Sequence, residues 1–296
     1  MSLRVATIGR NGQVAQALAS CAASEPDLTL IQASSADADL RDPDSLARFI
    51  DAVAPHIVIN AGAYNNLDRA ETERDAAFAI NAEGPRALAR ICAAREIGFV
   101  HMSTDCVFDG TKDGAYNEID TPNPLSVYGL SKHAGEIAVL EDNPAALTVR
   151  VCWVFSEFGE NFVSRMISLA RTRPDLRVVD DQSGPPTYAP DIATGLLAIA
   201  RGKHAAPASL CGLLHFAAPG RIDRASMARA IMDESRRQGG PFTNISPVST
   251  GAFGASATRP ANACLSSDIA TRQLRLAWTP WEAALEQSVR GILARG

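Results

Sequence analysis

The sequence predicts an α/β protein built on a doubly wound parallel sheet, with a smaller C-terminal lobe interleaved with it. Two observations predict this class. Up to residue 153, short apolar runs rich in β-branched residues alternate with helical segments, which is the order of βαβ units. Beyond that point the alternation weakens, and stretches rich in proline and glycine occupy 181–190 and 239–262. A chain of 296 residues is long enough to form two unequal lobes.

Each element is predicted by its own local pattern. The strands are expected where apolar runs are bounded by turn residues, at 4–8, 27–33, 57–59, 98–102 and 146–152. The helices are expected between these runs, around 17–19 and at 43–53, 70–81, 85–96 and 126–140. In a doubly wound sheet, ligands bind outside the carboxyl ends of the strands.

A glycine turn joins the first strand to the first helix. Gly9 and Gly12 permit a tight turn and a close backbone approach, and Ala15 takes the place of a third glycine in the dinucleotide-binding pattern. The N-terminus of the following helix offers unpaired N–H groups to a pyrophosphate. An ordinary strand-to-helix turn has similar residues, but the strand and helix around it favour a dinucleotide site.

The same pattern divides the chain into two parts. Residues 1–153 are expected to form an NAD(P)-binding, Rossmann-like domain. Residues 154–296 are expected to form mainly a substrate-binding lobe, with segments at about 177–200 and 213–218 returning to the first domain.

A second motif points to proton transfer. Thr104 follows the strand expected at 98–102, and Tyr128 and Lys132 lie four residues apart in an expected helix, so they share one face. A free tyrosine has a pKa of about 10, and a nearby ammonium group lowers it. We therefore expect Lys132 to lower the pKa of Tyr128 and make it a general acid. Tyrosine and lysine at this spacing are also common on amphipathic helices, so the pair indicates a catalytic function only in combination with the other motifs of the chain.

Composition and charge exclude several classes of function. The net charge of −5 and the lack of any run of Lys and Arg argue against nucleic acid as a partner. No apolar run approaches the length of a membrane span, and the N-terminus lacks the pattern of a signal peptide, so we expect a cytoplasmic protein. The six cysteines are scattered, so neither a metal site nor a disulfide framework is expected. A homodimer is left open.

Together these motifs resemble the extended short-chain dehydrogenase/reductases, and more narrowly the dTDP-4-dehydrorhamnose reductase family. The resemblance spans nearly the whole chain in the family's order. It rests on matching residues at 9–14, 60–64, 68–71, 81–85, 101–110, 124–136, 150–154, 161–162, 181–187 and 259–262.

The resemblance implies a reaction and a set of residues for it. NADPH would deliver hydride to C4 of a dTDP-linked 4-keto-6-deoxy sugar, dTDP-4-dehydro-L-rhamnose, giving dTDP-L-rhamnose. The implied catalytic residues are Tyr128 as proton donor, Lys132 on the nicotinamide ribose, and Thr104 on the reacting oxygen. The implied cofactor-binding residues, besides Lys132, are Gly9, Arg10, Asn11, Gly12, Gln13, Val14, Asp39, Leu40, Ala61, Gly62, Ala63 and Tyr64. The implied substrate-binding residues are Thr104, Asp105, Tyr128, Trp153 and Arg259. Some family members carry a magnesium ion between subunits, but the sequence shows no acidic cluster for one.

Several positions bear on which cofactor and which nucleotide sugar the protein uses. The acidic residue that would mark NAD after the second strand is missing, and Arg10 could reach a 2′-phosphate, so NADPH is favoured over NADH. Cys106 and Asn65 depart from the family's pattern beside the expected substrate site. A reductase or epimerase acting on another nucleotide sugar therefore stays an alternative. So does a non-catalytic nucleotide-binding subunit similar to the regulatory subunit of methionine adenosyltransferase.

Overall fold

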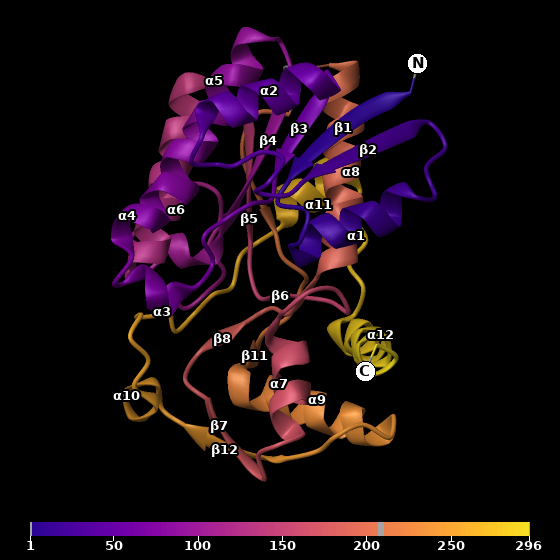
Figure 1. Ribbon diagram of the computed structural model, residues 1–296. Helices are drawn as coiled ribbons and strands as arrows, with labels where there is room; N and C mark the ends of the chain where they lie inside the picture. The colour runs from indigo at the N-terminus through magenta and orange to yellow at the C-terminus, as the bar shows by residue number, and fades with distance from the viewer. Residues whose placement is uncertain (1, 207–209, 296) are drawn as a thin grey trace.

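A computed structural model describes residues 2–206 and 210–295 (Figure 1). Its centre is a parallel sheet of six strands in the order β10-β5-β4-β3-β1-β2. The strands are β1 (Leu3–Ile8), β2 (Leu28–Ala33), β3 (Ile57–Asn60), β4 (Gly98–Thr104), β5 (Leu147–Val151) and β10 (Gly212–Phe216). The order reverses after β1, as in a doubly wound sheet, which confirms the predicted fold class.

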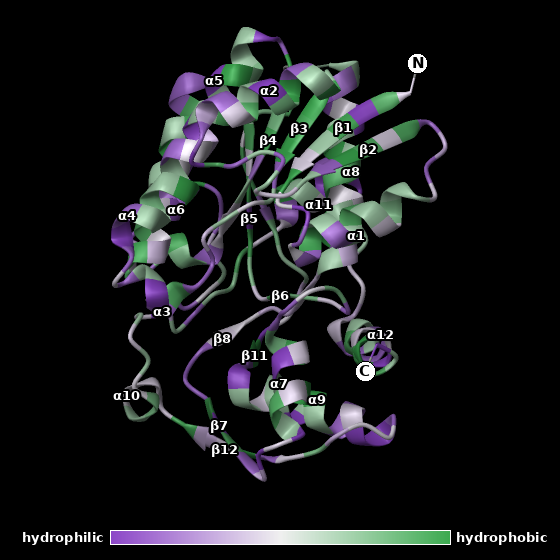
Figure 2. Cartoon of the chain, in the orientation of Figure 1, coloured by the Kyte–Doolittle hydropathy of each residue, from purple (hydrophilic) through white to green (hydrophobic). Residues whose placement is uncertain are grey.

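Helices cover both faces of this sheet. One face packs against α1 (Gln13–Ala22), α8 (Ala189–Ala205) and α11 (Asp268–Leu274). The other face packs against α2 (Pro43–Val53) and α5 (Gly84–Ala94), with α6 (Val127–Asp142) beside α5. Figure 2 shows the hydrophobic residues gathered along the strands between these layers. Helices on both faces bury most residues of these strands, and β3 is buried along its whole length.

The chain between β3 and α5 differs from the expected pair of separate helices. It contains two short helices, α3 (Leu67–Ala70) and α4 (Arg74–Phe78), and a π-helical turn at Ala79–Glu83 leads directly into α5. In this turn the side-chain oxygen of Asn81 accepts from the backbone N–H of Tyr64 (2.8 Å), and its amide donates to Ser131 Oγ (3.0 Å). The turn therefore ties the loop after β3 to helix α6.

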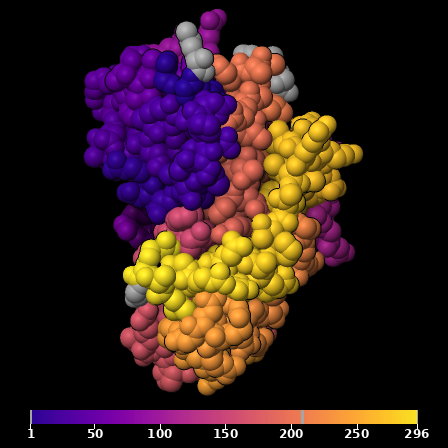
Figure 3. Space-filling model, turned by 90° about the vertical axis from the view of Figure 1, so that its right-hand side faces the viewer, coloured from indigo at the N-terminus to yellow at the C-terminus, as the bar shows by residue number. Residues whose placement is uncertain are grey.

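A smaller lobe lies below the sheet in Figure 1. Its hydrophobic core is formed mainly by three helices together with short strand pairs. Its helices are α7 (Phe162–Ala170), α9 (Arg224–Arg237), α10 (Thr250–Phe253) and α12 (Trp281–Leu293). Its strands are β6 (Val154–Phe155), β7 (Asp175–Val179), β8 (Ser183–Gly184), β9 (Thr187–Tyr188), β11 (Ile222–Asp223) and β12 (Asn244–Val248). Figure 3 shows the C-terminal segment as a yellow band above the orange α9.

The chain passes between the two lobes more than once. Strand β7 pairs with β12 in the smaller lobe, and the chain returns to the sheet only with α8, later than the expected start at about residue 177. Strand β10 then joins the sheet edge beside β5, and α11 packs on it. The division of function at residue 153 stays a prediction. Within the described residues, no helix is both long and apolar enough to cross a membrane.

Candidate functional site

The turn after β1 brings two loops of the sheet into direct backbone contact. Gly9 has a φ of +99°, and a Cβ atom there would lie 2.7 Å from the Cα of Gly62 in the loop after β3. Only glycine fits this position without strain. Gly12 donates its N–H to the carbonyl of Gly9 (3.0 Å) and caps α1, so the helix N-terminus faces the space above these loops. Such a terminus attracts anionic groups.

A pocket of about 660 Å³ opens at this point. The turns after β1, β2 and β3 all contribute to its wall, because these strands are neighbours in the sheet and end at the same edge. The following expected cofactor residues line it: Gly9, Arg10, Asn11, Gly12, Gln13, Asp39, Leu40, Ala61, Gly62 and Ala63. Its size and its glycine cradle fit part of a dinucleotide.

Three expected cofactor residues do not line this pocket. Val14 packs against the hydrophobic core of the sheet. The phenol of Tyr64 donates to Glu73 Oε2 (2.5 Å). Lys132 lies farther along the sheet edge, where its Nζ donates to the carbonyl of Met102 (2.6 Å). Their assignment to the cofactor stays a prediction.

Charged side chains form one wall of the pocket, and only some of them were expected from the sequence. Arg10 Nη1 lies 3.8 Å from Asp37 Oδ2, and Arg41 Nη2 lies 2.7 Å from Asp39 Oδ2. Arg41 was missed, although it follows the expected pair Asp39 and Leu40 directly. Other lining residues that were not assigned to the cofactor are Ile8, Ser34, Ser35, Ala38, Asn65, Ile80 and Glu160.

Helix α6 brings Tyr128 to the end of β4. Ser126 caps the helix by accepting from the N–H of Gly129 (3.2 Å). A Cβ atom on Gly129 would overlap the carbonyl oxygen of Cys106, so the first turn of α6 packs directly on the chain that follows Thr104. The hydroxyl of Thr104 donates to Asp105 Oδ1 (3.0 Å) and accepts from the N–H of Cys106 (3.2 Å).

The pKa of Tyr128 is shifted in the direction opposite to the expected one. Burial raises this pKa, the neighbouring Cys106 and Asp105 raise it further, and a hydrogen bond with Thr104 lowers it. Lys132 is not among the groups that act on it. Burial lowers the pKa of Lys132 to about 8, while the charge of Glu136 opposes that shift. The expectation that Lys132 lowers the pKa of Tyr128 is therefore wrong for this structure, because burial dominates.

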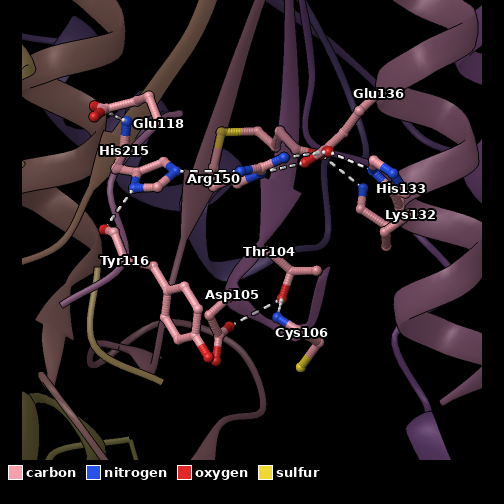
Figure 4. Close-up of polar contacts among 11 residues, drawn as sticks. Thr104, Asp105, Cys106, Tyr116, Glu118, Lys132, His133, Glu136, Arg150 and His215 are labelled. Carbon is pink, nitrogen blue, oxygen red and sulfur yellow. Dashed lines mark hydrogen bonds and ion pairs between the residues drawn. The ribbon is translucent and has the colours of Figure 1, made fainter. Parts of the chain in front are cut away.

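A buried polar network holds α6 against the sheet (Figure 4). Arg150 on β5 donates from Nε and Nη2 to the two carboxylate oxygens of Glu136 on α6, at 2.7 Å each. His215 on β10 lies 3.4 Å from Arg150 Nη1, and His133 lies 3.0 Å from Glu136. Although burial raises the pKa of Glu136, its bonds with Arg150 and His133 hold that pKa at about 2. The network positions the helix that carries Tyr128 and Lys132.

Asp105, Trp153 and Arg259 are the expected substrate residues outside the catalytic group, and Trp153 packs against the hydrophobic core of the smaller lobe. Burial raises the pKa of Asp105 to about 6, while its bond with Thr104 lowers it. Arg259 pairs with Asp68, with Nη2 2.9 Å from Oδ2. Trp153 is covered by Arg224, whose guanidinium carbon lies 3.4 Å from the ring centroid. Arg224 was not among the expected site residues, because nothing in its local sequence pattern indicates that it meets Trp153.

The described ranges, 2–206 and 210–295, contain no group of three or more His, Cys, Asp or Glu side chains arranged to hold a metal ion.

Comparison with known proteins places this geometry in a family. The family model described as the RmlD substrate binding domain matches residues 3–293. The chain belongs to the dTDP-4-dehydrorhamnose reductase family. A dTDP-4-dehydrorhamnose reductase of Sinorhizobium fredii is 36% identical over 295 residues, covering 99% of each chain. One of Mycobacterium tuberculosis is 38% identical over 297 residues, covering 96% of this chain and 91% of its own.

The similarity extends from the sequence to the three-dimensional fold. The crystal structure of a dTDP-4-dehydrorhamnose reductase from Bacillus anthracis in complex with NADP has a TM-score of 0.87 and 30% sequence identity, over the whole of both chains. The family expected from the sequence is confirmed. The two positions at which the sequence departs from the pattern expected for this family both lie in the candidate site. Cys106 is partly buried beside Tyr128, and Asn65 lines the glycine-loop pocket.

Proposed function

We propose that this protein reduces the C4 ketone of dTDP-4-dehydro-L-rhamnose with NADPH, giving dTDP-L-rhamnose. One observation carries the proposal: the glycine-loop pocket and the group formed by Thr104, Tyr128 and Lys132 lie at the same edge of one parallel sheet. Membership of the dTDP-4-dehydrorhamnose reductase family over residues 3–293 supports the substrate.

The cofactor site fits a dinucleotide phosphate. The backbone approach between Gly9 and Gly62 leaves room for a pyrophosphate at the N-terminus of α1. Arg10 and Arg41 provide cationic groups on the wall where a 2′-phosphate would be recognised. NADPH supplies the hydride when it is bound there. The solved relative in complex with NADP supports NADPH as a cofactor of this site.

Tyr128 supplies the proton. Its raised pKa keeps the phenol protonated at neutral pH, so it can donate to the oxygen of the ketone as negative charge develops. The hydroxyl of Thr104 donates to Asp105 in this structure, and it must rotate before it can donate to the same oxygen. Lys132 lies one helical turn from Tyr128, where its ammonium can hold ribose hydroxyls and replace the lost proton.

The test is a cofactor-oxidation assay with defined substrates. NADPH absorbance is followed with dTDP-4-keto-6-deoxyglucose and the partner 3,5-epimerase, alongside NADH and a control without sugar. We expect oxidation that requires the sugar and yields dTDP-L-rhamnose, faster with NADPH than with NADH. If NADPH binds but none is oxidised, the proposed substrate is wrong, and Cys106 and Asn65 become the positions that select another keto-sugar.

A further inference from the structure

Arg224 is the first residue of α9 and faces the catalytic site from the smaller lobe. Its guanidinium carbon lies 3.4 Å above the Trp153 ring and 5.0 Å from the centroid of Phe162. The backbone N–H of Arg224 donates to the carbonyl of Gln182 (3.1 Å), and Asp223 caps the helix. The base of the side chain is therefore held in place, and the aromatic rings set the orientation of its charged end.

The donors of this guanidinium are free within the described part of the chain. Stacking on Trp153 uses the face of the planar group, whereas its five N–H donors lie around its edge. Among residues 2–206 and 210–295, no acceptor forms a hydrogen bond or an ion pair with that edge. The side chain is only partly buried, so a ligand can reach these donors.

The other expected anion-binding arginine in this region is already paired. Arg259 places Nη2 2.9 Å and Nη1 3.4 Å from the two oxygens of Asp68, and Nη1 also donates to the carbonyl of Ala257. Much of its charge is thus balanced by protein. Asp105 brings an opposite charge near Arg224, but within residues 2–206 and 210–295 Arg224 forms no ion pair. Burial lowers the pKa of Arg224 to about 10, so the group stays charged at neutral pH.

We propose that Arg224 binds the diphosphate of the nucleotide-sugar substrate from the wall formed by Trp153, and that it provides more of the phosphate affinity than Arg259 does. This inference rests on the proposed function, because it takes the ligand to be a nucleotide diphosphate. A guanidinium edge matches two phosphate oxygens at once. Asp105 and Cys106, whose titration responds to Arg224, place it close to the sugar end of the site.

The test compares the binding of dTDP and of thymidine by calorimetry. The two ligands share a base and a sugar, and only dTDP carries the diphosphate. In Arg224→Met we expect dTDP affinity to fall about 10- to 100-fold, and thymidine affinity to stay within about two-fold. Arg224→Lys keeps a charge without the planar fork and should lie between Arg224→Met and the wild type. The matched control is Arg229→Met, an exposed position on the same helix, which should bind both ligands like the wild type.

NADPH binding shows whether each variant is folded, since the glycine-loop pocket lies in the other lobe. Unchanged dTDP affinity in Arg224→Met would overturn the inference, as would an equal loss of dTDP and thymidine in a variant that still binds NADPH. A wild-type protein that binds no dTDP would overturn both this inference and the proposed function. If dTDP binding depends on Arg224 but no keto-sugar is reduced, the inference stands and only the proposed function fails.

Discussion

At the scale of single residues, the surroundings of Tyr128 and Asp105 determine the protonation of these two groups. Tyr128 is partly buried beside Thr104, Cys106 and Asp105, and removal of its phenol from water raises its pKa. A phenol that keeps its proton at neutral pH is suited to donate it when a ketone becomes an alkoxide. Burial also raises the pKa of Asp105 to about 6, so this carboxyl group is still mostly ionised at neutral pH, unlike the phenol.

The role of Tyr128 is tested by Tyr128→Phe, which removes one oxygen atom and keeps the ring. We expect kcat to fall by about 100- to 10,000-fold, because general acid catalysis contributes that much. NADPH affinity should stay unchanged. Tyr188→Phe is the matched control, since the phenol of Tyr188 donates to Glu157 in the smaller lobe, and it should leave kcat near the wild-type value. Normal turnover by Tyr128→Phe would show that another group supplies the proton.

The raised pKa of Asp105 predicts how the stability of the protein depends on pH. Its pKa in the folded protein, about 6, lies above the usual value of 3.8. Its favourable contribution is therefore present below pH 3.8 and is lost as the pH rises through about 6. Asp105→Asn should raise the free energy of unfolding at pH 8 by up to about 3 kcal/mol, with no gain at pH 4.

Urea unfolding at the two pH values measures this effect of Asp105. Asp109→Asn gives the opposite case, because hydrogen bonds from Thr111, Asn123 and Tyr116 lower the pKa of Asp109. That variant should be less stable than the wild type at pH 8. A loss of stability at pH 8 in Asp105→Asn would mean that the buried carboxylate is stabilised by its neighbours and not strained by them.

Arg41 is predicted to select the cofactor. Arg41→Ala should lower kcat/KM with NADPH by about 3- to 10-fold and change kcat/KM with NADH little, because only NADPH carries a 2′-phosphate to pair with the guanidinium. Arg48→Ala, on the exposed side of α2, is the control. Equal effects of Arg41→Ala on both cofactors would remove Arg41 from phosphate recognition.

At the scale of elements, the turn after β1 shapes the cofactor site. It brings the N-terminus of α1 to the edge where β1, β3 and β4 end, and it contacts the loop after β3 through Gly9 and Gly62. On the other side, the pair of Glu136 and Arg150 joins α6 to β5. The contact between Gly9 and Gly62 and the buried ion pair of Glu136 and Arg150 together determine how the cofactor pocket lies relative to Tyr128.

Gly9→Ala tests the loop contact. Its added methyl group would lie 2.7 Å from the Cα of Gly62, and its φ of +99° would be strained, at a cost of about 1–3 kcal/mol. We expect a lower melting temperature and at least about a 10-fold loss of NADPH affinity. Gly114→Ala is the control, because no heavy atom lies within 4 Å of its added Cβ. Wild-type NADPH affinity in Gly9→Ala would contradict the close approach of the two loops.

At the scale of the whole molecule, the sequence predicted what depends on local pattern. The alternation of strands and helices predicted the parallel sheet, and the spacing of Tyr128 and Lys132 predicted their common helix. It could not predict the effect of burial on Tyr128, which depends on how α6 packs against Cys106. Nor could it predict that Arg224 meets Trp153, because 70 intervening residues fold into other elements before α9 returns to the site.

Isotope transfer tests directly whether this site delivers hydride to C4 of a dTDP-linked keto-sugar. The protein is supplied with NADPH deuterated at the transferred position and dTDP-4-dehydro-L-rhamnose, and the product is examined by NMR. We expect dTDP-L-rhamnose carrying deuterium at C4, and formation of this labelled sugar at least about 100-fold more slowly with Tyr128→Phe. Labelled cofactor left intact, or deuterium at another carbon of the sugar, would contradict this expectation.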